Sequence, residues 1–321
     1  MSSKSITSPS FTFLLSRLTK LTSTYSGLDA SLMLVQYSSP LVIAVLLALS
    51  RLIKRARLSG LAGYGQKGAA VASGWGLLQL AEGWGKMGVS VGDARVVFRA
   101  FGLLPILQYL LTLHPNPIAS LKKFIFSIGQ KGSLSSEKTL PTLQLLSLAA
   151  YYPLEHIAWL ASKGILPISA QRTGKAALWS VRFWALYVLL DIYKSRQTYI
   201  SLLKRTKQLK YQKPIIQKQE AEGFELPPSP SSPSTEKPTA SLTTPTTSTT
   251  IKSEEDNVST KAQLQNDWKV WKNQAMINSG YAPLTVHWST PGGLWTNPLI
   301  SGTFGCVAAV GRLTAEWRKG N

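Results

Sequence analysis

Hydrophobic positions recur at helical spacing along most of the chain. Between residues 11 and 35 apolar side chains follow one another mostly every three or four positions, and Arg17 and Lys20 fall outside that stripe. A second helix is predicted to start near Pro40, which suits a first helical turn, and to run into the basic residues that end at Arg57. Both segments are amphipathic, so we expect them to lie along a surface with part of their depth buried.

The uncharged stretch from Ala30 to Ser50 is also long enough to cross a bilayer. Polar residues and a proline interrupt it, and a helix lying in the interface is therefore the preferred interpretation. The glycine-rich residues 60–92 either let helices approach closely in lipid or form a loose helix, and both interpretations stay open. Another apolar helix is predicted over residues 94–113, with Pro105 as a kink.

Two apolar runs, residues 140–162 and 176–193, are joined by a short basic loop and predict a helical hairpin. Residues 194–218 then carry eight basic side chains and no acid, a pattern typical of a cytosolic segment beside a membrane. Residues 219–262 hold six prolines and many serines and threonines but few large apolar side chains. This composition predicts a disordered linker.

The last segment has the strongest membrane character. No Lys, Arg, Asp or Glu occurs between Lys272 and Arg312, and a helix of 22 residues here would be about 33 Å long, close to the bilayer's hydrocarbon thickness. We expect this helix to cross the membrane, followed in preference by residues 176–193, while Pro153, Glu155 and His156 make a span at 140–162 doubtful. A small-residue stripe predicts helix packing or oligomerisation and consists of Ser301, Gly305 and Ala309.

The predicted fold is an all-α, membrane-associated helical bundle with amphipathic surface helices, an apolar helical hairpin and a C-terminal apolar helix, interrupted by a disordered linker. Four regions follow from this pattern. They are a basic amphipathic region (1–130), the hairpin with its polybasic extension (131–218), the linker (219–262) and a C-terminal membrane helix region (263–321).

Charge supports the same interpretation. The chain has 35 Lys and Arg against 15 Asp and Glu, a net charge of +20, yet only 16% of its residues are charged and 44% are hydrophobic. An anionic lipid surface suits such a chain better than nucleic acid. Nucleic-acid binding would call for stacking aromatic residues interleaved with Lys and Arg, whereas most aromatic residues here lie in apolar runs.

Catalytic and metal-binding patterns are missing from the sequence. The single Cys306 excludes an intramolecular disulfide, and the three histidines match no local metal spacing. The G-x-G-x-x-G pattern at residues 63–68 lacks the strand that should precede a nucleotide-binding loop. Glu155 and His156 are neighbours that point to different faces of a helix, which favours a structural polar contact inside the membrane. We therefore predict no enzyme activity, no cofactor and no metal.

Three stretches resemble the peroxin-11 family of peroxisomal membrane proteins, in particular its gamma-type branch. The first runs from Tyr151 to Trp159 and has the pattern YYP-x-EH-x-AW; the second is the apolar run from Phe183 to Leu190; the third runs from Val286 to Trp295. The motif residues are Tyr151, Tyr152, Pro153, Glu155, His156, Trp159, His287 and Trp288.

The resemblance implies a protein of the peroxisomal membrane that elongates the organelle before it divides. Members of the family insert amphipathic helices into one leaflet, self-associate with related members, and cooperate with a fission adaptor and a dynamin-like GTPase. On this hypothesis the lipid-inserting residues are Phe11, Leu14, Leu15, Leu18, Leu49, Leu52 and Ile53. The residues that contact anionic headgroups are Arg17, Lys20, Arg51, Lys54 and Arg55.

Two alternatives stay open beside membrane remodelling. A channel or transporter for small metabolites is a role that the resemblance also allows, although the sequence pattern offers few clean spans. A mitochondrial membrane protein is suggested by the N-terminal residues, which are rich in Ser and Thr and contain no acid before Asp29.

Overall fold

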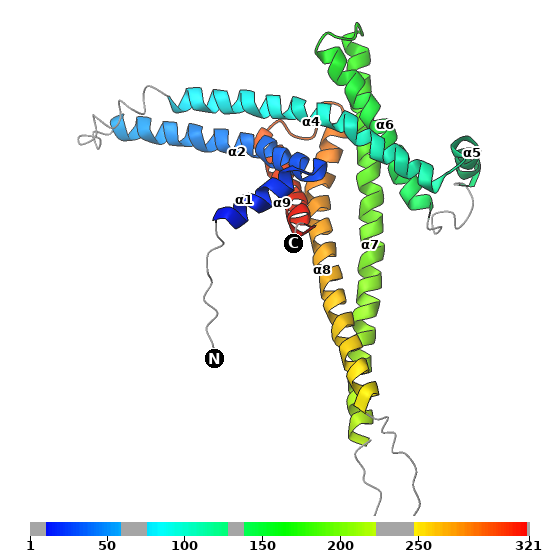
Figure 1. Ribbon diagram of the computed structural model, residues 1–321. Helices are drawn as coiled ribbons and strands as arrows, with labels where there is room; N and C mark the ends of the chain where they lie inside the picture. Colours follow the sequence, from blue (N-terminus) through cyan, green and yellow to red (C-terminus); the bar gives the residue numbers. More distant parts are fainter. Residues whose placement is uncertain (1–10, 59–75, 128–137, 223–246, 320–321) are drawn as a thin grey trace, which may run out of the picture. The chain divides into compact units, whose positions relative to one another are not determined.

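The computed structural model describes residues 11–58, 76–127, 138–222 and 247–319, and these residues form α-helices without a β-strand (Figure 1). This confirms the predicted all-α class. The helices are α1 (Phe11–Thr22), α2 (Tyr25–Leu58), α4 (Leu77–Leu113), α5 (Pro117–Ser127), α6 (Thr139–Ser162), α7 (Ala170–Glu222), α8 (Thr247–Ser289) and α9 (Pro298–Lys319). The chain divides into two compact units, Met1–Lys194 with Asn273–Asn321, and Ser195–Lys272.

The predicted helix over residues 11–35 is wrong, because the structure breaks it at Ser23 and Thr24. The Thr24 hydroxyl accepts a hydrogen bond from the Gly27 backbone N–H at 3.1 Å, which caps the start of α2. A Cβ at Gly27 would overlap the carbonyl oxygen of Leu21 at the end of α1. Glycine at this position therefore lets the two helices meet at a tight turn.

The predicted helix start at Pro40 is also wrong, because α2 continues through this proline. Proline lacks the N–H that would bond to the preceding turn. The hydroxyls of Ser38 and Ser39 both donate to the carbonyl of Val35, and α9 packs Gly302 against the proline ring. Side-chain hydrogen bonds and a neighbouring helix are known to make proline tolerable within a long membrane helix.

The α4 helix begins earlier than predicted and lies alongside α2 (Figure 1). A Cβ at Gly88 would meet Ser39, and one at Gly92 would meet Gln36, so these glycines lie against α2. This confirms the close-approach interpretation for the C-terminal part of the glycine-rich segment. Residues 60–75, with the G-x-G-x-x-G pattern, lie outside the described residues. As predicted, the helix ends at the His114–Pro117 segment.

The predicted hairpin is confirmed as α6 and the first part of α7. Tyr151 stacks on Trp184, and Gln144 donates to Asp191, so rising numbers on α6 face falling numbers on α7 and the pair is antiparallel. Helices extend into both ends of the predicted linker, since α7 ends at Glu222 and α8 begins at Thr247. The part between them, residues 223–246, lies outside the described residues.

The core of the larger unit forms where α9 packs against α2. Met33, Ala308 and Ala309 are fully buried, and Tyr37 and Tyr281 pack around them. A Cβ at Gly280 of α8 would lie 2.5 Å from the Phe304 carbonyl oxygen, so α8 and α9 also pack closely here. Small residues thus allow three helices to share one tight centre.

The second unit is a pair of helical segments from α7 and α8. Tyr199, Trp268 and Trp271 form a cluster of rings, with centroids 4.9 to 5.8 Å apart. The indole N–H of Trp271 donates to the Ser195 carbonyl, and that of Trp268 donates to the Thr206 hydroxyl. These contacts hold the two segments together within this unit.

Four of the described helices are long and apolar enough to cross a membrane: Tyr25–Arg55, Leu77–Leu113, Ala170–Tyr211 and Pro298–Lys319. The predicted preference for the terminal helix and for residues 176–193 agrees with this set, and α6 is absent from it. The expectation that few segments could span a membrane, which spoke against a channel, is wrong. Helices α2 and α4 in the N-terminal half are also long and apolar enough to cross a bilayer.

Candidate functional site

A partly buried ion pair joins the motif helix α6 to α4. The guanidinium of Arg99 donates to both carboxylate oxygens of Glu155, at 2.6 and 2.8 Å, and the Tyr151 hydroxyl donates to the same carboxylate at 2.9 Å. The two charged side chains are 17% and 19% exposed. Burial raises the pKa of the Tyr151 phenol well above its usual value, so this group stays a hydrogen-bond donor.

Two more motif residues bind α4. One ring nitrogen of His156 lies 2.9 Å from the Val96 carbonyl oxygen, and the other lies 2.6 Å from that of Tyr152 in its own helix. The indole N–H of Trp159 donates to Asp93 at 2.9 Å. The motif thus holds α6 onto α4, and Glu155 and His156 both contact α4 although they are neighbours in sequence. These contacts are structural polar contacts, the kind that the sequence favours for this pair.

Aromatic residues from the three stretches that carry the resemblance lie together in one stack. Trp184 of α7 lies between Tyr151 of α6 and Trp288 of α8, with ring centroids 6.4 and 5.9 Å apart and planes within 30° of parallel. Trp288 stacks in turn on Tyr37 of α2 at 6.3 Å. Four helices therefore meet at this stack, and residues distant in sequence share one structural role.

His287 fixes the turn between α8 and α9. Its ring stacks on Trp295 with centroids 4.1 Å apart, and its Nδ1 accepts a hydrogen bond from the Leu294 backbone N–H. Gly292 and Gly293 adopt positive φ values of 81° and 74°, a conformation that glycine adopts without strain. The role of His287 is therefore structural, because its ring stacking and its hydrogen bond both stabilise this turn.

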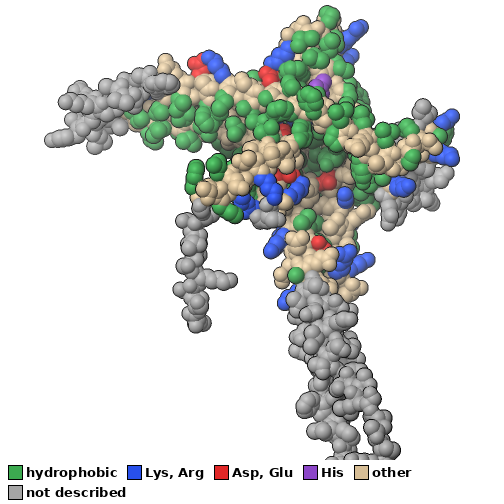
Figure 2. Space-filling view, viewed as in Figure 1, with side chains coloured by type: hydrophobic (Ala, Val, Ile, Leu, Met, Phe, Trp, Pro, Cys, Tyr) green, Lys and Arg blue, Asp and Glu red, His purple; other side chains and the backbone are tan. Residues whose placement is uncertain are grey.

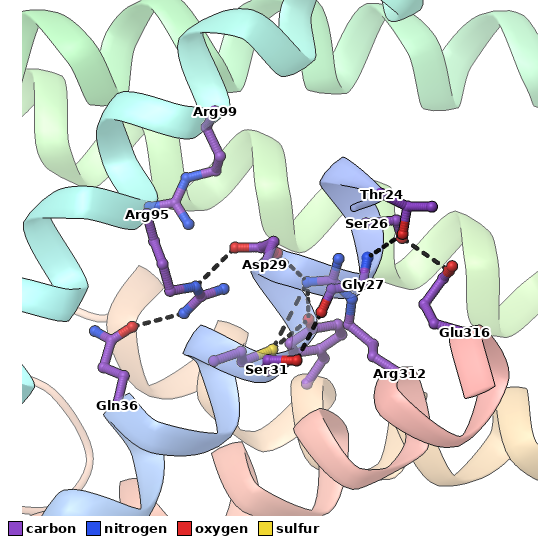
Figure 3. Close-up of polar contacts among 12 residues, drawn as sticks. Thr24, Ser26, Gly27, Asp29, Ser31, Gln36, Arg95, Arg99, Arg312 and Glu316 are labelled. Atoms are coloured by element: carbon purple, nitrogen blue, oxygen red, sulfur yellow. Dashed lines mark hydrogen bonds and ion pairs between the residues drawn. The ribbon is translucent and has the colours of Figure 1, made fainter. Parts of the chain in front are cut away.

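A second buried charge cluster joins α2, α4 and α9 (Figure 3). Asp29 accepts from Arg95 at 2.8 Å through one oxygen and from Arg312 through the other. The side chains of Asp29 and Arg95 are only 6% and 7% exposed, and Gln36 accepts a further bond from Arg95 at 2.6 Å. One carboxylate thus fixes three helices, each of which is a candidate span.

A third buried polar group lies where α6, α7 and α8 meet. The Asp191 carboxylate accepts hydrogen bonds from the amides of Gln274 and Asn278, at 2.7 and 2.8 Å, and a longer one from Gln144. Asn273 donates to the Gly311 carbonyl of α9. Sequence reasoning missed these contacts and the Asp29 cluster, although a lone carboxylate in an apolar run is itself a sign of a partner on another helix.

The predicted lipid-inserting face of α1 is exposed. Phe11 is 77% exposed, and Leu14, Leu15 and Leu18 on the same face are 38%, 52% and 49% exposed. Of the predicted headgroup contacts, Arg17 binds within the chain: it stacks on the Trp317 ring at 4.2 Å and donates to the Trp317 carbonyl at 2.9 Å. Lys20 lines a cavity beside it.

The second predicted patch lies near the end of α2. Leu49, Leu52 and Ile53 are exposed. Arg51, Lys54 and Arg55 are exposed beside them and line an open hollow of about 580 Å³. The cavity beside Lys20 and the hollow beside Arg51 share no lining residue.

Apolar surface continues over α2 and α4, where Figure 2 shows a broad band of hydrophobic side chains. Its α4 members include Val89, Val97, Phe101, Leu104 and Leu107, each at least 40% exposed. The short helix α5 adds Ile125 and Phe126 beside Lys122 and Lys123. Exposed apolar area of this extent is typical of a surface that contacts lipid.

The small-residue stripe on α9 packs inside the chain. A Cβ at Gly305 would overlap the Tyr37 ring, Ala309 is fully buried, and Ser301 accepts a hydrogen bond from the Trp295 indole. These contacts are helix packing between α9 and its neighbours. Oligomerisation through the stripe stays a prediction.

Among the described residues, no group of three or more His, Cys, Asp or Glu side chains could hold a metal ion. The charged clusters above are held by several hydrogen bonds each and join helices. The exposed surface includes large apolar areas with basic side chains beside them. Apolar surface bordered by basic side chains is typical of proteins that contact an anionic membrane.

The fold and these surfaces define a class: an all-α protein with helices suited to a membrane and held together by buried polar contacts. The chain belongs to the family Peroxisomal biogenesis factor 11 (PEX11), whose model matches residues 78–265, more than half of its length. This is a family of peroxisomal membrane proteins involved in peroxisome proliferation, and it is not known for enzymes.

The match begins in α4 and ends within α8, so it includes the motif in α6 and excludes the Val286–Trp295 stretch. No curated protein and no solved structure matches the chain.

Proposed function

We propose that this protein elongates the peroxisomal membrane by inserting an amphipathic helix into one leaflet, and so promotes division of the organelle. The exposed apolar face of α1 is the observation that carries the proposal. A soluble helix would turn Leu14, Leu15 and Leu18 toward a core, whereas here they point away from the rest of their unit.

A helix buried to part of its depth expands the leaflet that it enters and leaves the other unchanged, so the bilayer bends. Each fully buried leucine contributes about 1.5 to 3 kcal/mol to insertion. Basic side chains add up to about 1 kcal/mol each near an anionic surface. Several such residues on α1 and at the end of α2 therefore favour a bent membrane.

We further propose that the protein belongs to the gamma-type branch and resides in the peroxisomal membrane. It self-associates with related members and cooperates with a fission adaptor and a dynamin-like GTPase. The motif in α6 supports the branch assignment. The partners follow from the family resemblance, and binding of the purified chain to each partner tests them.

The test uses the full-length protein reconstituted into anionic vesicles, with tubules counted by electron microscopy. We expect the wild type to form tubules and Leu18→Glu to form at least tenfold fewer, since a charge on the apolar face opposes insertion. Ser16→Glu is the matched control, because Ser16 is exposed on the opposite face of the same helix. Tubulation by Leu18→Glu at the wild-type level would refute the proposal.

A channel for small metabolites is the second candidate, and the four candidate spans favour it. Partly buried polar side chains such as Asp191 form hydrogen bonds between helices. Conductance of the full-length protein in planar bilayers separates the two functions. A steady conductance that Asp191→Leu alters would support a channel, and a silent bilayer would exclude it.

A further inference from the structure

We propose that a cavity between α1 and the end of α9 binds a phosphate group, that of an anionic phospholipid at the leaflet surface. The cavity has a volume of about 110 Å³. It is lined by Arg17, Lys20, Leu21, Thr24, Glu316, Trp317 and Lys319. This site deepens the proposed function, on which it rests, by naming what α1 recognises beyond the hydrocarbon.

The charges of the lining favour an anion. Three of its side chains are cationic (Arg17, Lys20 and Lys319), and one is a carboxylate, Glu316. That carboxylate already accepts hydrogen bonds from the Ser26 hydroxyl at 2.8 Å and from Lys319 at 2.7 Å. Guanidinium and ammonium groups at one place form charge-assisted hydrogen bonds to phosphate oxygens.

The guanidinium is held in position before any ligand arrives. Arg17 lies over the Trp317 ring at 4.2 Å and donates one hydrogen bond to the Trp317 carbonyl at 2.9 Å. Leu21 is buried beneath it and joins α1 to the rest of the unit. A cation fixed by a ring and a carbonyl loses little conformational freedom when it binds an anion.

Size and position both suit a lipid headgroup. The cavity, about 110 Å³ and partly open to solvent, has room for a phosphate group. Lys319 ends a candidate span, and the exposed apolar residues of α1 start at Phe11, about two and a half turns before Lys20. The end of a span beside an inserted helix is the depth at which phospholipid phosphates lie.

The experiment measures lipid retention by the full-length protein in detergent micelles with native mass spectrometry. The probes are dioleoyl phosphatidic acid, dioleoylglycerol, which has the same acyl chains without phosphate, and inorganic phosphate as a competitor. We expect the wild type to retain one phosphatidic acid per chain. Arg17→Gln and Lys319→Gln should each weaken this retention about tenfold. Lys204→Gln, an exposed lysine of the other unit, is the matched control and should retain lipid like the wild type.

Several results would overturn the inference. Equal loss in Lys204→Gln and Lys319→Gln would mean general charge attraction, and equal retention of dioleoylglycerol would mean that the phosphate is not recognised. Displacement of phosphatidic acid by an equal concentration of inorganic phosphate would assign the cavity to free phosphate instead of lipid. Circular dichroism of each variant checks that its helices are intact.

The inference and the proposed function fail separately. Leu18→Glu should keep the retained phosphatidic acid, because Leu18 does not line the cavity, while it should lose tubulation. Loss of lipid in Lys319→Gln together with unchanged tubulation in Leu18→Glu would keep the cavity and reject the insertion mechanism. The reverse pair of results would reject the cavity alone.

Discussion

Replacing Glu155 with leucine should unfold the larger unit far more easily, because the guanidinium of Arg99 would then stay buried without an anion. Three hydrogen bonds of 2.6 to 2.9 Å end on this carboxylate, two from Arg99 and one from Tyr151. Removing one partner of a buried ion pair typically costs about 3 to 5 kcal/mol. That is a large share of the roughly 5 to 15 kcal/mol that stabilises a typical protein.

Removing both partners should cost much less. In Arg99→Met with Glu155→Leu, no charge is left without a partner, and apolar side chains of similar length fill the space. Such replacements are often neutral or stabilising. The free energy of unfolding of the double variant should therefore lie within about 1 to 2 kcal/mol of the wild type, and the coupling energy between the two positions should exceed about 2 kcal/mol.

The assay is equilibrium unfolding of the full-length protein in mixed detergent micelles, followed by helical circular dichroism. Glu82→Gln is the control, because Glu82 pairs with Lys86 on the same helix as Arg99 but both side chains are at least 67% exposed. It should unfold like the wild type. If Glu155→Leu is as stable as the wild type, or if the double variant is as unstable as the sum of the single variants, the ion pair does not join α4 and α6.

Two more changes probe packing and topology. Gly305→Leu should lower the free energy of unfolding by at least about 1 to 3 kcal/mol, because its side chain would overlap an α2 ring. Gly174→Ala is the control, because Gly174 has open space around it, and it should be neutral or stabilise by up to about 1 kcal/mol. Equal effects of Gly305→Leu and Gly174→Ala would contradict the packing of α9 against α2. If α2 lies in one leaflet, single cysteines at Ser16 and Arg51, in a Cys306→Ser background, both react with a membrane-impermeant maleimide added outside vesicles. Reaction at one of them alone would mean that α2 crosses the bilayer.

Local patterns were enough to predict the class and several elements. Three features depend only on residues that are close in sequence. They are the helical period of α6, the break at residues 163–169 and the apolar run of α9. Helix ends that depend on other helices were not predictable in this way. From the sequence alone, a proline at position 40 indicates a helix start. In the structure Pro40 lies inside α2, because α9 covers it and serine hydroxyls form hydrogen bonds to the turn before it.

The candidate site was predictable only in part. Exposure of the α1 face follows from its periodicity, and the structural role of Glu155 follows from its place beside His156 on a helix. The partners of Asp29 do not follow from any local pattern, because Arg95 and Arg312 are 66 and 283 residues away. What the sequence does offer is that Asp29 is the first acidic residue of the chain, within an apolar stretch, where a charge calls for a partner.

The wide separation of Asp29 and Arg312 sets an order of assembly during synthesis. Arg95 leaves the ribosome soon after α2 and can neutralise Asp29 early, whereas Arg312 arrives only after some two hundred further residues. Until then Met33 and Tyr37 have no α9 to cover them. The N-terminal helices must therefore wait in a partly assembled state, and this interval is when a chaperone or a neighbouring chain has most access to α2.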